Sequence, residues 1–271
     1  MGVFFPFFRL APRGSLLALE PYTSVEIGAG FFAPRRGLLY TSPMNDLSIA
    51  AIKRLSDQGA LSDSDLQTLK GDPRAGVQAL VARVLRRQEA EKRALARVEE
   101  MLEKERELWR RGVRLIAGVD EVGVGPLAGP VVAAAVILAP DTRIPGVDDS
   151  KKLSHARRVE LSALIRREAV DFAVGRCEPE EIDEHNIYQA SRLAMFRAVS
   201  NLKRPPEHLL VDARRVPHVQ MGQTSMIRGD SRSHSIAAAS IVAKVERDVF
   251  MERLGLKYPG YGFEKHRGYG T

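Results

Sequence analysis

The spacing of apolar residues changes about 110 residues into the chain. Before Gly112, apolar residues recur every three or four positions, which is the period of an amphipathic helix. After Gly112, short apolar runs bounded by glycine and proline alternate with longer helical patterns. The change predicts a helical N-terminal region, residues 44–112, followed by an α/β domain, residues 113–271.

Three helices are predicted in the N-terminal region. Asn45 or Asp46 is expected to cap a first short helix, and Ser62 or Ser64 a second. A long third helix is expected over residues 73–111, because apolar residues mark a stripe along it. Its Arg, Lys and Glu residues are interspersed, which favours a solvated face with i,i+4 ion pairs over a nucleic-acid grip.

Strands and helices alternate in the second region. The runs predicted as strands are "RLIAGVDE", "VVAAAVILA", "DFAVGRCE", "HLLVDA" and "SMIRG". Ser154 is expected to cap one helix and Ser233 or Ser235 another, while residues 178–202 form one long helix or a pair. This order predicts a mixed sheet covered by helices.

The first 43 residues differ from the rest. They hold six of the ten phenylalanines and neither Lys nor Asp, and proline and glycine interrupt them. They lack the basic start and continuous apolar segment of a signal peptide. A transit peptide is one interpretation; the favoured one is that they form a non-core leader from an upstream mis-start, with the native start at Met44.

Composition narrows the class of protein. With 28% charged and 44% hydrophobic residues, the chain is typical of a globular protein, and its net charge of +7 favours nucleic acid as a partner. The single cysteine, Cys177, excludes an intrachain disulfide and a Cys-rich zinc site and is expected to be a small buried hydrophobe. A reducing, cytoplasmic location is expected, and no stretch is apolar enough to predict a membrane span.

Four acidic residues stand where strands end or loops begin: Asp120, Glu121, Asp212 and Asp230. Ligands of open α/β sheets bind at the carboxyl edge of the strands. Converging carboxylates repel one another unless a cation joins them, and their oxygens suit Mg²⁺ or Mn²⁺. Two such ions can hold the attacking and leaving oxygens of a phosphodiester. The residues therefore indicate metal-dependent chemistry, with phosphoryl transfer as one candidate.

A simpler interpretation of these acids stays open, since an Asp at a strand end is often only a turn or cap residue. Adjacent strand residues also point to opposite faces, so Asp120 and Glu121 share a site only if the chain bends there. Gly123 and Gly125 make such a bend plausible, although a lone Gly-x-Gly is weak as a signal.

Taken together, six stretches resemble the ribonuclease HII family, in the family's order and spacing. They are "AGVDEVGVGPLAGPVVAAAVIL", "DDSKKLS", "IDEHNIYQASRLAM", "LLVDA", "GDSRSHSIAAASIVAKVERD" and "YPGYGFEKHRGYGT". The helical segment ending "EKERELWRRG" resembles the N-terminal extension of some bacterial members. The resemblance implies a ribonuclease H-like fold, a mixed five-stranded sheet flanked by helices.

The resemblance also implies an activity. Members hydrolyse the RNA strand of RNA/DNA hybrids and nick duplex DNA 5′ of an embedded ribonucleotide, as in ribonucleotide excision repair. They leave 3′-hydroxyl and 5′-phosphate ends and require Mg²⁺ or Mn²⁺. No obligate protein partner is evident, and a monomer is expected.

The resemblance assigns roles residue by residue. Asp120, Glu121, Asp212 and Asp230 match the metal-binding acids. The amides of Gly123, Val124 and Gly125 match the loop that senses the ribose 2′-hydroxyl, the group that distinguishes RNA from DNA. The tyrosine that stacks at the RNA–DNA junction and the phosphate-contacting or site-bordering positions match Tyr269, Lys151, Lys152, Asn186 and Lys244. For the last four, a solvated surface position, or a helix cap at Asn186, is the alternative.

Two departures from the family pattern leave an alternative function open. Val124 stands where the family has Arg, and the chain stops at Thr271, where the family continues into a basic helical tail. A catalytically impaired hybrid-binding protein is therefore the alternative to the enzyme. A third interpretation is a nuclease of the same fold that acts on DNA junctions. Such a nuclease would share the acids, but this interpretation does not explain the Gly-x-Gly loop or the tyrosine.

Overall fold

A computed structural model describes residues 43–270 of the chain. The leader predicted over residues 1–43 lies almost wholly outside the described residues. The chain divides into two compact units, one ending at Val77 and the other spanning Gln78–Thr271. Within the described residues, no helix is both long and apolar enough to cross a membrane.

The first unit contains a 3₁₀ helix, η1 (Met44–Asp46), and the helices α1 (Ile49–Asp57) and α2 (Asp63–Lys70). Ser62 caps α2 as predicted, in a capping box with Asp65. The prediction that Asn45 or Asp46 caps α1 is wrong. Both lie in η1, and the Ser48 hydroxyl accepts the hydrogen bond from the Ala51 amide instead.

The long helix predicted over residues 73–111 is two helices, α3 (Ala75–Met101) and α4 (Glu103–Arg110). Leu102 separates them with φ −87° and ψ 6°. Leu102 is itself buried and continues the apolar stripe, so the spacing of apolar residues gives no sign of the break.

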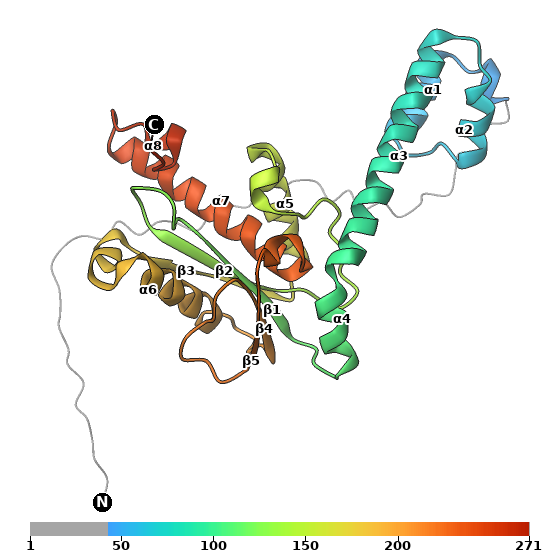
Figure 1. The fold of residues 1–271 in the computed structure, drawn as a ribbon. Helices are drawn as coiled ribbons and strands as arrows, with labels where there is room; N and C mark the ends of the chain where they lie inside the picture. Colours follow the sequence, from blue (N-terminus) through green and yellow to red (C-terminus); the bar gives the residue numbers. More distant parts are fainter. Residues whose placement is uncertain (1–42, 271) are drawn as a thin grey trace, which may run out of the picture. The chain divides into compact units, whose positions relative to one another are not determined.

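The mixed sheet is confirmed. Its strands are β1 (Ile116–Val122), β2 (Val131–Ile137), β3 (Asp171–Cys177), β4 (His208–Asp212) and β5 (Gly222–Met226), in the order β3-β2-β1-β4-β5 (Figure 1). The pairs β1–β2 and β2–β3 are antiparallel, and β1–β4 and β4–β5 are parallel. The last strand ends at Met226, earlier than predicted, because Ile227 is exposed and Arg228 turns with φ 55°.

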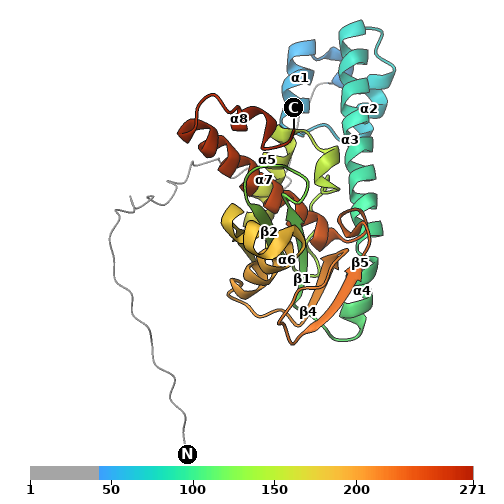
Figure 2. The ribbon, with the colours of Figure 1, turned by 60° about the vertical axis from the view of Figure 1, so that its left-hand side comes forward.

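Helices cover both faces of the sheet (Figures 1 and 2). The helices of this unit after β2 are η2 (Ser150–Lys152), α5 (His155–Glu168), α6 (Pro179–Ser200), η3 (Gly229–Ser231), α7 (His234–Lys257) and α8 (Phe263–His266), of which α8 packs against α7. Ser154 and Ser233 cap α5 and α7, as the sequence predicts. On one face α6 contacts β1, β2 and β3, and on the other α7 contacts β1 and β2.

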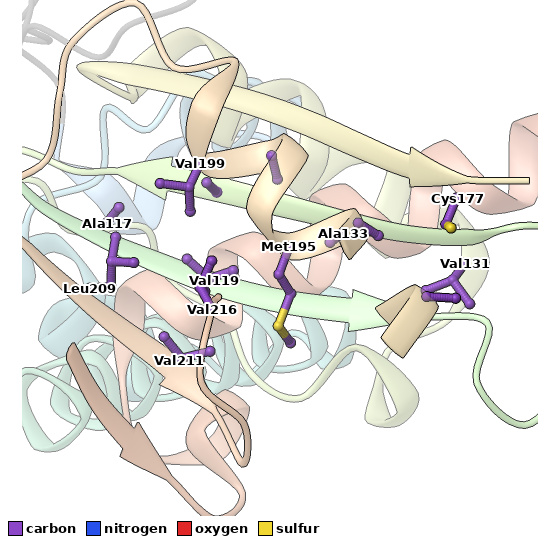
Figure 3. Close-up of a cluster of buried hydrophobic side chains, with 14 of the residues drawn as sticks. Ala117, Val119, Val131, Ala133, Cys177, Met195, Val199, Leu209, Val211 and Val216 are labelled. Carbon is purple, nitrogen blue, oxygen red and sulfur yellow. The ribbon is translucent and has the colours of Figure 1, made fainter. Parts of the chain in front are cut away.

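Alternate residues of the strands form two cores. Ala117 and Val119 of β1 pack with Met195 of α6, and Cys177 lies in the same cluster (Figure 3). Cys177 is fully buried, as predicted, and burial raises the pKa of its thiol to about 11. The opposite face carries the alanine-rich start of α7.

Gly118 lets α7 approach β1 closely. A Cβ atom there would lie 2.0 Å from the backbone carbon of Ser235, which is shorter than any real contact. The close approach brings the middle of α7 alongside the carboxyl end of β1, where the first two acidic residues stand.

Candidate active site

Four acidic residues from three elements gather at the carboxyl end of β1. Asp120 and Glu121 lie within β1, and Asp212 is the last residue of β4, the parallel neighbour of β1. Asp230 lies in η3, which is joined to β4 because the Gly229 amide donates to Asp212 Oδ1 over 2.6 Å. The parallel pairing and this hydrogen bond bring together what the sequence separates by more than 100 positions.

The bend expected at Asp120 and Glu121 is absent, which corrects the sequence argument. Both stay in the regular ladder opposite Ala134 and Ala133 of β2, and the turn comes at Gly123, with φ 105°. Their side chains leave opposite faces of the strand. They still influence each other because both stand at the edge where Asp212 ends the neighbouring strand.

Burial and mutual repulsion both raise carboxyl pKa values in the cluster. Burial raises the pKa of Asp120 well above its usual value, and the charges of Glu121 and Asp212 raise it further. Burial also raises the pKa of Glu121, against the opposing effect of Arg214, which lies 3.2 Å away. Asp230 is raised in pKa by burial and by Asp149 and Asp212.

The cluster has the donor chemistry for a divalent cation. Its ligands are carboxylate oxygens, which hard cations prefer, and Glu121 Oε2 is buried with no hydrogen-bond partner. A cation would relieve the repulsion that raises the pKa values of these groups. As placed, no three His, Cys, Asp or Glu side chains among residues 43–270 already form a set that could hold one ion.

Asp149 borders the cluster and was not predicted as a site residue. Its negative charge and a side-chain hydrogen bond to Asp230 both raise the pKa of the Asp230 carboxyl. Asp149 Oδ1 also accepts a hydrogen bond from the Lys151 amide over 2.9 Å. The signal was available in "DDSKKLS", but nothing in the sequence says which Asp of the pair faces the other acids.

The glycine loop after β1 is held by a buried arginine. Arg247 of α7 is fully buried, and its guanidinium donates to the carbonyls of Pro130, Ala128 and Arg267. A Cβ at Gly123 would lie 2.5 Å from the Pro130 oxygen, so the loop needs glycine there. Arg247 therefore joins the end of the loop that precedes β2 to the C-terminal segment, and it lies against Gly123 at the start of the loop.

The same contacts place Tyr269 beside the loop. The Leu127 amide donates to the Gly268 carbonyl over 2.8 Å, directly before Tyr269, whose ring is partly exposed. Lys244 Nζ lies 5.8 Å from the centre of that ring and 2.7 Å from Asp248 Oδ1. Val124 is half-buried in the loop, while a Cβ at Gly125 would meet open space.

The other predicted contact residues lie in two places. Lys151 and Lys152 are exposed on η2. The positive charge of Lys151 lowers the pKa values of Glu121 and Asp230, opposing the effect of burial. Lys152 Nζ lies 3.2 Å from Asp148 Oδ1. Asn186 interrupts α6 with φ 65° and ψ 161°. Its side chain accepts from the amides of Tyr188 and Gln189, so it caps the second part of the helix.

Comparison with known proteins assigns the family. Residues 117–271 match the model of ribonuclease HII, and residues 48–109 match the model of the ribonuclease HII N-terminal domain. The chain belongs to the ribonuclease HII family. It is therefore a nuclease of the ribonuclease H class, in a family that depends on divalent metal ions and binds RNA/DNA hybrids.

Relatives support this assignment over most of the chain. The ribonuclease HII of Geobacillus thermodenitrificans is 53% identical over 210 residues, which cover 78% of this chain and 81% of that protein. That of Myxococcus xanthus is 53% identical over 207 residues, covering 76% and 71%. The crystal structure of ribonuclease H2 from Pyrococcus horikoshii matches with a TM-score of 0.51 and 29% identity, covering 58% of this chain and 81% of that one. The expected ribonuclease H-like fold is confirmed.

Proposed function

We propose that this chain is an endonuclease that hydrolyses the RNA strand of RNA/DNA hybrids and nicks duplex DNA 5′ of embedded ribonucleotides. The products carry 3′-hydroxyl and 5′-phosphate ends, which fits a role in ribonucleotide excision repair. The observation that carries the proposal is the gathering of Asp120, Glu121 and Asp212 at one strand edge, with the glycine loop directly after β1.

Each part of the site has a proposed task. Asp120, Glu121, Asp212 and Asp230 hold Mg²⁺ or Mn²⁺, which when bound supplies positive charge to the attacking and leaving oxygens of the phosphodiester. Unpartnered Glu121 Oε2 and the raised carboxyl pKa values support this assignment.

The loop and the C-terminal segment are proposed to select the substrate. The amides of Gly123, Val124 and Gly125 contact the 2′-hydroxyl, which DNA lacks. Tyr269 stacks against the junction nucleotide, and Arg247 keeps the two recognition segments together.

Basic and polar side chains around the site are proposed to position the phosphates, which carry no sequence information. They are Lys151, Lys152, Lys244 and Asn186. For Asn186 this contact would be additional to its capping bonds. A cytoplasmic, monomeric protein remains the prediction from the sequence.

The alternative is a catalytically impaired protein that binds hybrids, prompted by Val124 in place of the family's Arg. The presence of all four acids favours the enzyme, since a pure binder has no need of mutually repelling buried carboxylates.

One experiment separates these functions. The protein is incubated with a duplex that bears a single ribonucleotide, with Mn²⁺ or with chelator, and Asp120→Asn is the control variant. We expect a cut 5′ of the ribonucleotide only with metal, and none by Asp120→Asn. Binding without cutting identifies the hybrid binder, and equal cutting of a ribonucleotide-free junction identifies the DNA nuclease.

The Asn control also tests the electrostatics of the cluster. Because the raised pKa of Asp120 means that its ionised form destabilises the folded protein, removing the charge should leave the metal-free stability unchanged or raise it. Near-normal cleavage by Asp120→Asn would remove Asp120 from the metal site.

A further inference from the structure

The segment that carries Asp230 is held by helices as well as by the sheet. Asp230 lies in η3, whose first residue, Gly229, donates its amide to Asp212 at the end of β4. From the other direction, Arg97 of α3 donates to the Ser231 carbonyl over 2.5 Å. A helix of the N-terminal extension therefore contacts the backbone directly after Asp230.

Glu105 of α4 makes the second and larger contact. Its side chain is almost fully buried, and Oε1 accepts from the Ser233 hydroxyl over 2.6 Å, the Ser235 hydroxyl over 2.8 Å and the Ser235 amide over 3.1 Å. Ser233 is the cap of α7 and Ser235 lies in its first turn. Amides in a first turn lack helical partners, and the positive end of the helix dipole favours a carboxylate there.

Glu105 also lines a small, mostly apolar cavity. Glu105, Trp109 and His234 border this cavity of about 10 Å³ together with apolar side chains. That volume has room for about one water molecule. Glu105 Oε2, Trp109 Nε1 and both ring nitrogens of His234 are buried without hydrogen-bond partners.

A buried carboxylate without a cationic partner costs free energy, so its contacts need an explanation. Within the described chain no Lys or Arg forms an ion pair with Glu105, and its side-chain hydrogen bonds to other residues go to Ser233 and Ser235, in the segment that follows Asp230. The two serines are separated from Asp230 by three and five positions, a short and backbone-bonded link through Ser233 N to Gly229 O.

We propose that Glu105 is a positioning residue for Asp230, acting through Ser233 and Ser235. Helix α4 of the N-terminal extension is then part of the support of the active site. The inference rests on the proposed function only in taking Asp230 as a member of the metal-binding cluster. Misplacing one acid should weaken metal binding and slow the chemical step, while the recognition loop and Tyr269 keep their own contacts.

The test compares Glu105→Ala and Glu105→Gln with Glu107→Gln, a control on the same helix whose side chain is half-exposed and pairs with Lys104. Three quantities are measured: hydrogen exchange of residues 229–236, the rise in melting temperature on adding Mn²⁺, and kcat and KM for the single-ribonucleotide duplex. We expect Glu105→Ala to exchange faster in this segment, to lose most of the Mn²⁺ shift, and to lose about 10- to 100-fold in kcat with little change in KM. Glu107→Gln should match the parent.

A double-mutant cycle covers the case in which Glu105→Ala fails to fold. Glu105→Gln keeps the shape of the side chain, and Ser235→Ala removes one donor. If the two residues act as one contact, the double variant loses little more kcat than the worse single variant. Strictly multiplicative losses would overturn the proposal.

The remaining outcomes are also decisive. Parent-like kcat and Mn²⁺ shift in a folded, destabilised Glu105→Ala would show an ordinary helix contact and overturn the inference. If the parent protein itself cuts no ribonucleotide duplex, the proposed function fails. Hydrogen exchange and the Mn²⁺ shift need no substrate, so they still decide whether Glu105 positions the Asp230 segment.

Discussion

Val124 lies in the middle of a loop whose conformation depends on backbone contacts. Arg247 holds the loop by the carbonyls of Ala128 and Pro130, and Gly123 has a positive φ, so no side chain of residue 124 is needed to shape it. If the loop amides sense the 2′-hydroxyl, valine in place of arginine costs a contact with a phosphate, while the discrimination between RNA and DNA is kept.

Val124→Arg should therefore tighten substrate binding without changing the preference for ribonucleotides. One more neutralised phosphate steepens the dependence of log affinity on log salt by about one unit. The measurement is binding and cleavage of matched duplexes, with and without one ribonucleotide, at two salt concentrations. A changed choice of duplex would mean that residue 124 itself contacts the sugar.

His234 predicts a pH dependence of stability. Burial, with a smaller effect of Arg143, lowers the pKa of its ring from 6.5 to about 4. Since the unfolded chain takes up this proton first, the stability contributed by the neutral ring is complete above about pH 6.5, falls progressively below it, and is largely lost by about pH 4. The parent should lose about 3 kcal/mol more than His234→Leu between pH 7 and pH 4, measured by urea unfolding at each pH. If the parent and His234→Leu lose the same stability between pH 7 and pH 4, the ring of His234 is exposed to solvent and not buried.

At the scale of elements, the contact between β1 and α7 sets the position of the acids. Gly118 has no room for a side chain, because the Ser235 backbone lies against it. The same strand carries Asp120 two residues later, and the same helix begins with the serines that Glu105 holds.

Gly118→Ala should destabilise the fold by about 1–3 kcal/mol, the usual cost of overpacking. Gly125→Ala is the matched control, since a Cβ there meets nothing within 4 Å and φ is not in the left-handed region; its stability should change by at most about 0.5 kcal/mol. Chemical denaturation checks both. Equal effects would mean that β1 and α7 can separate without cost.

At the scale of the whole molecule, α4 belongs to the core of the second unit. Leu108 is buried in one cluster with Ile116, Leu210 and Ile236. The cluster joins α4 to β1 and β4, the two strands that carry Asp120, Glu121 and Asp212, and to the start of α7. The N-terminal extension is thus not a single independent part.

Two truncations should separate its parts. Removing residues 1–77 leaves Glu105 and Leu108 in place, so the melting temperature of the remaining unit and its response to Mn²⁺ should persist. Removing residues 1–112 exposes the cluster and should cost at least about 2–5 kcal/mol, the range for one large apolar side chain lost from a core. Equal stability of the two truncated chains would contradict this division.

The sequence by itself determined the local structure and the chemical groups. Apolar periodicity located the strands and helices, and serines marked the starts of α2, α5 and α7. The motifs indicated the family and named the acids. These features depend on residues a few positions apart, which is the range over which hydrogen bonding and side-chain spacing act in a helix or strand.

The tertiary structure decided how those groups meet. It placed Asp120 and Glu121 on opposite faces of an unbent strand, Asp149 beside Asp230, and the Glu105 carboxylate in hydrogen-bond contact with the start of α7. Strand register and close helix packing bring residues more than 100 positions apart into contact. No local pattern encodes the partner of a buried carboxylate, because its free energy depends on which donors the rest of the fold delivers to it.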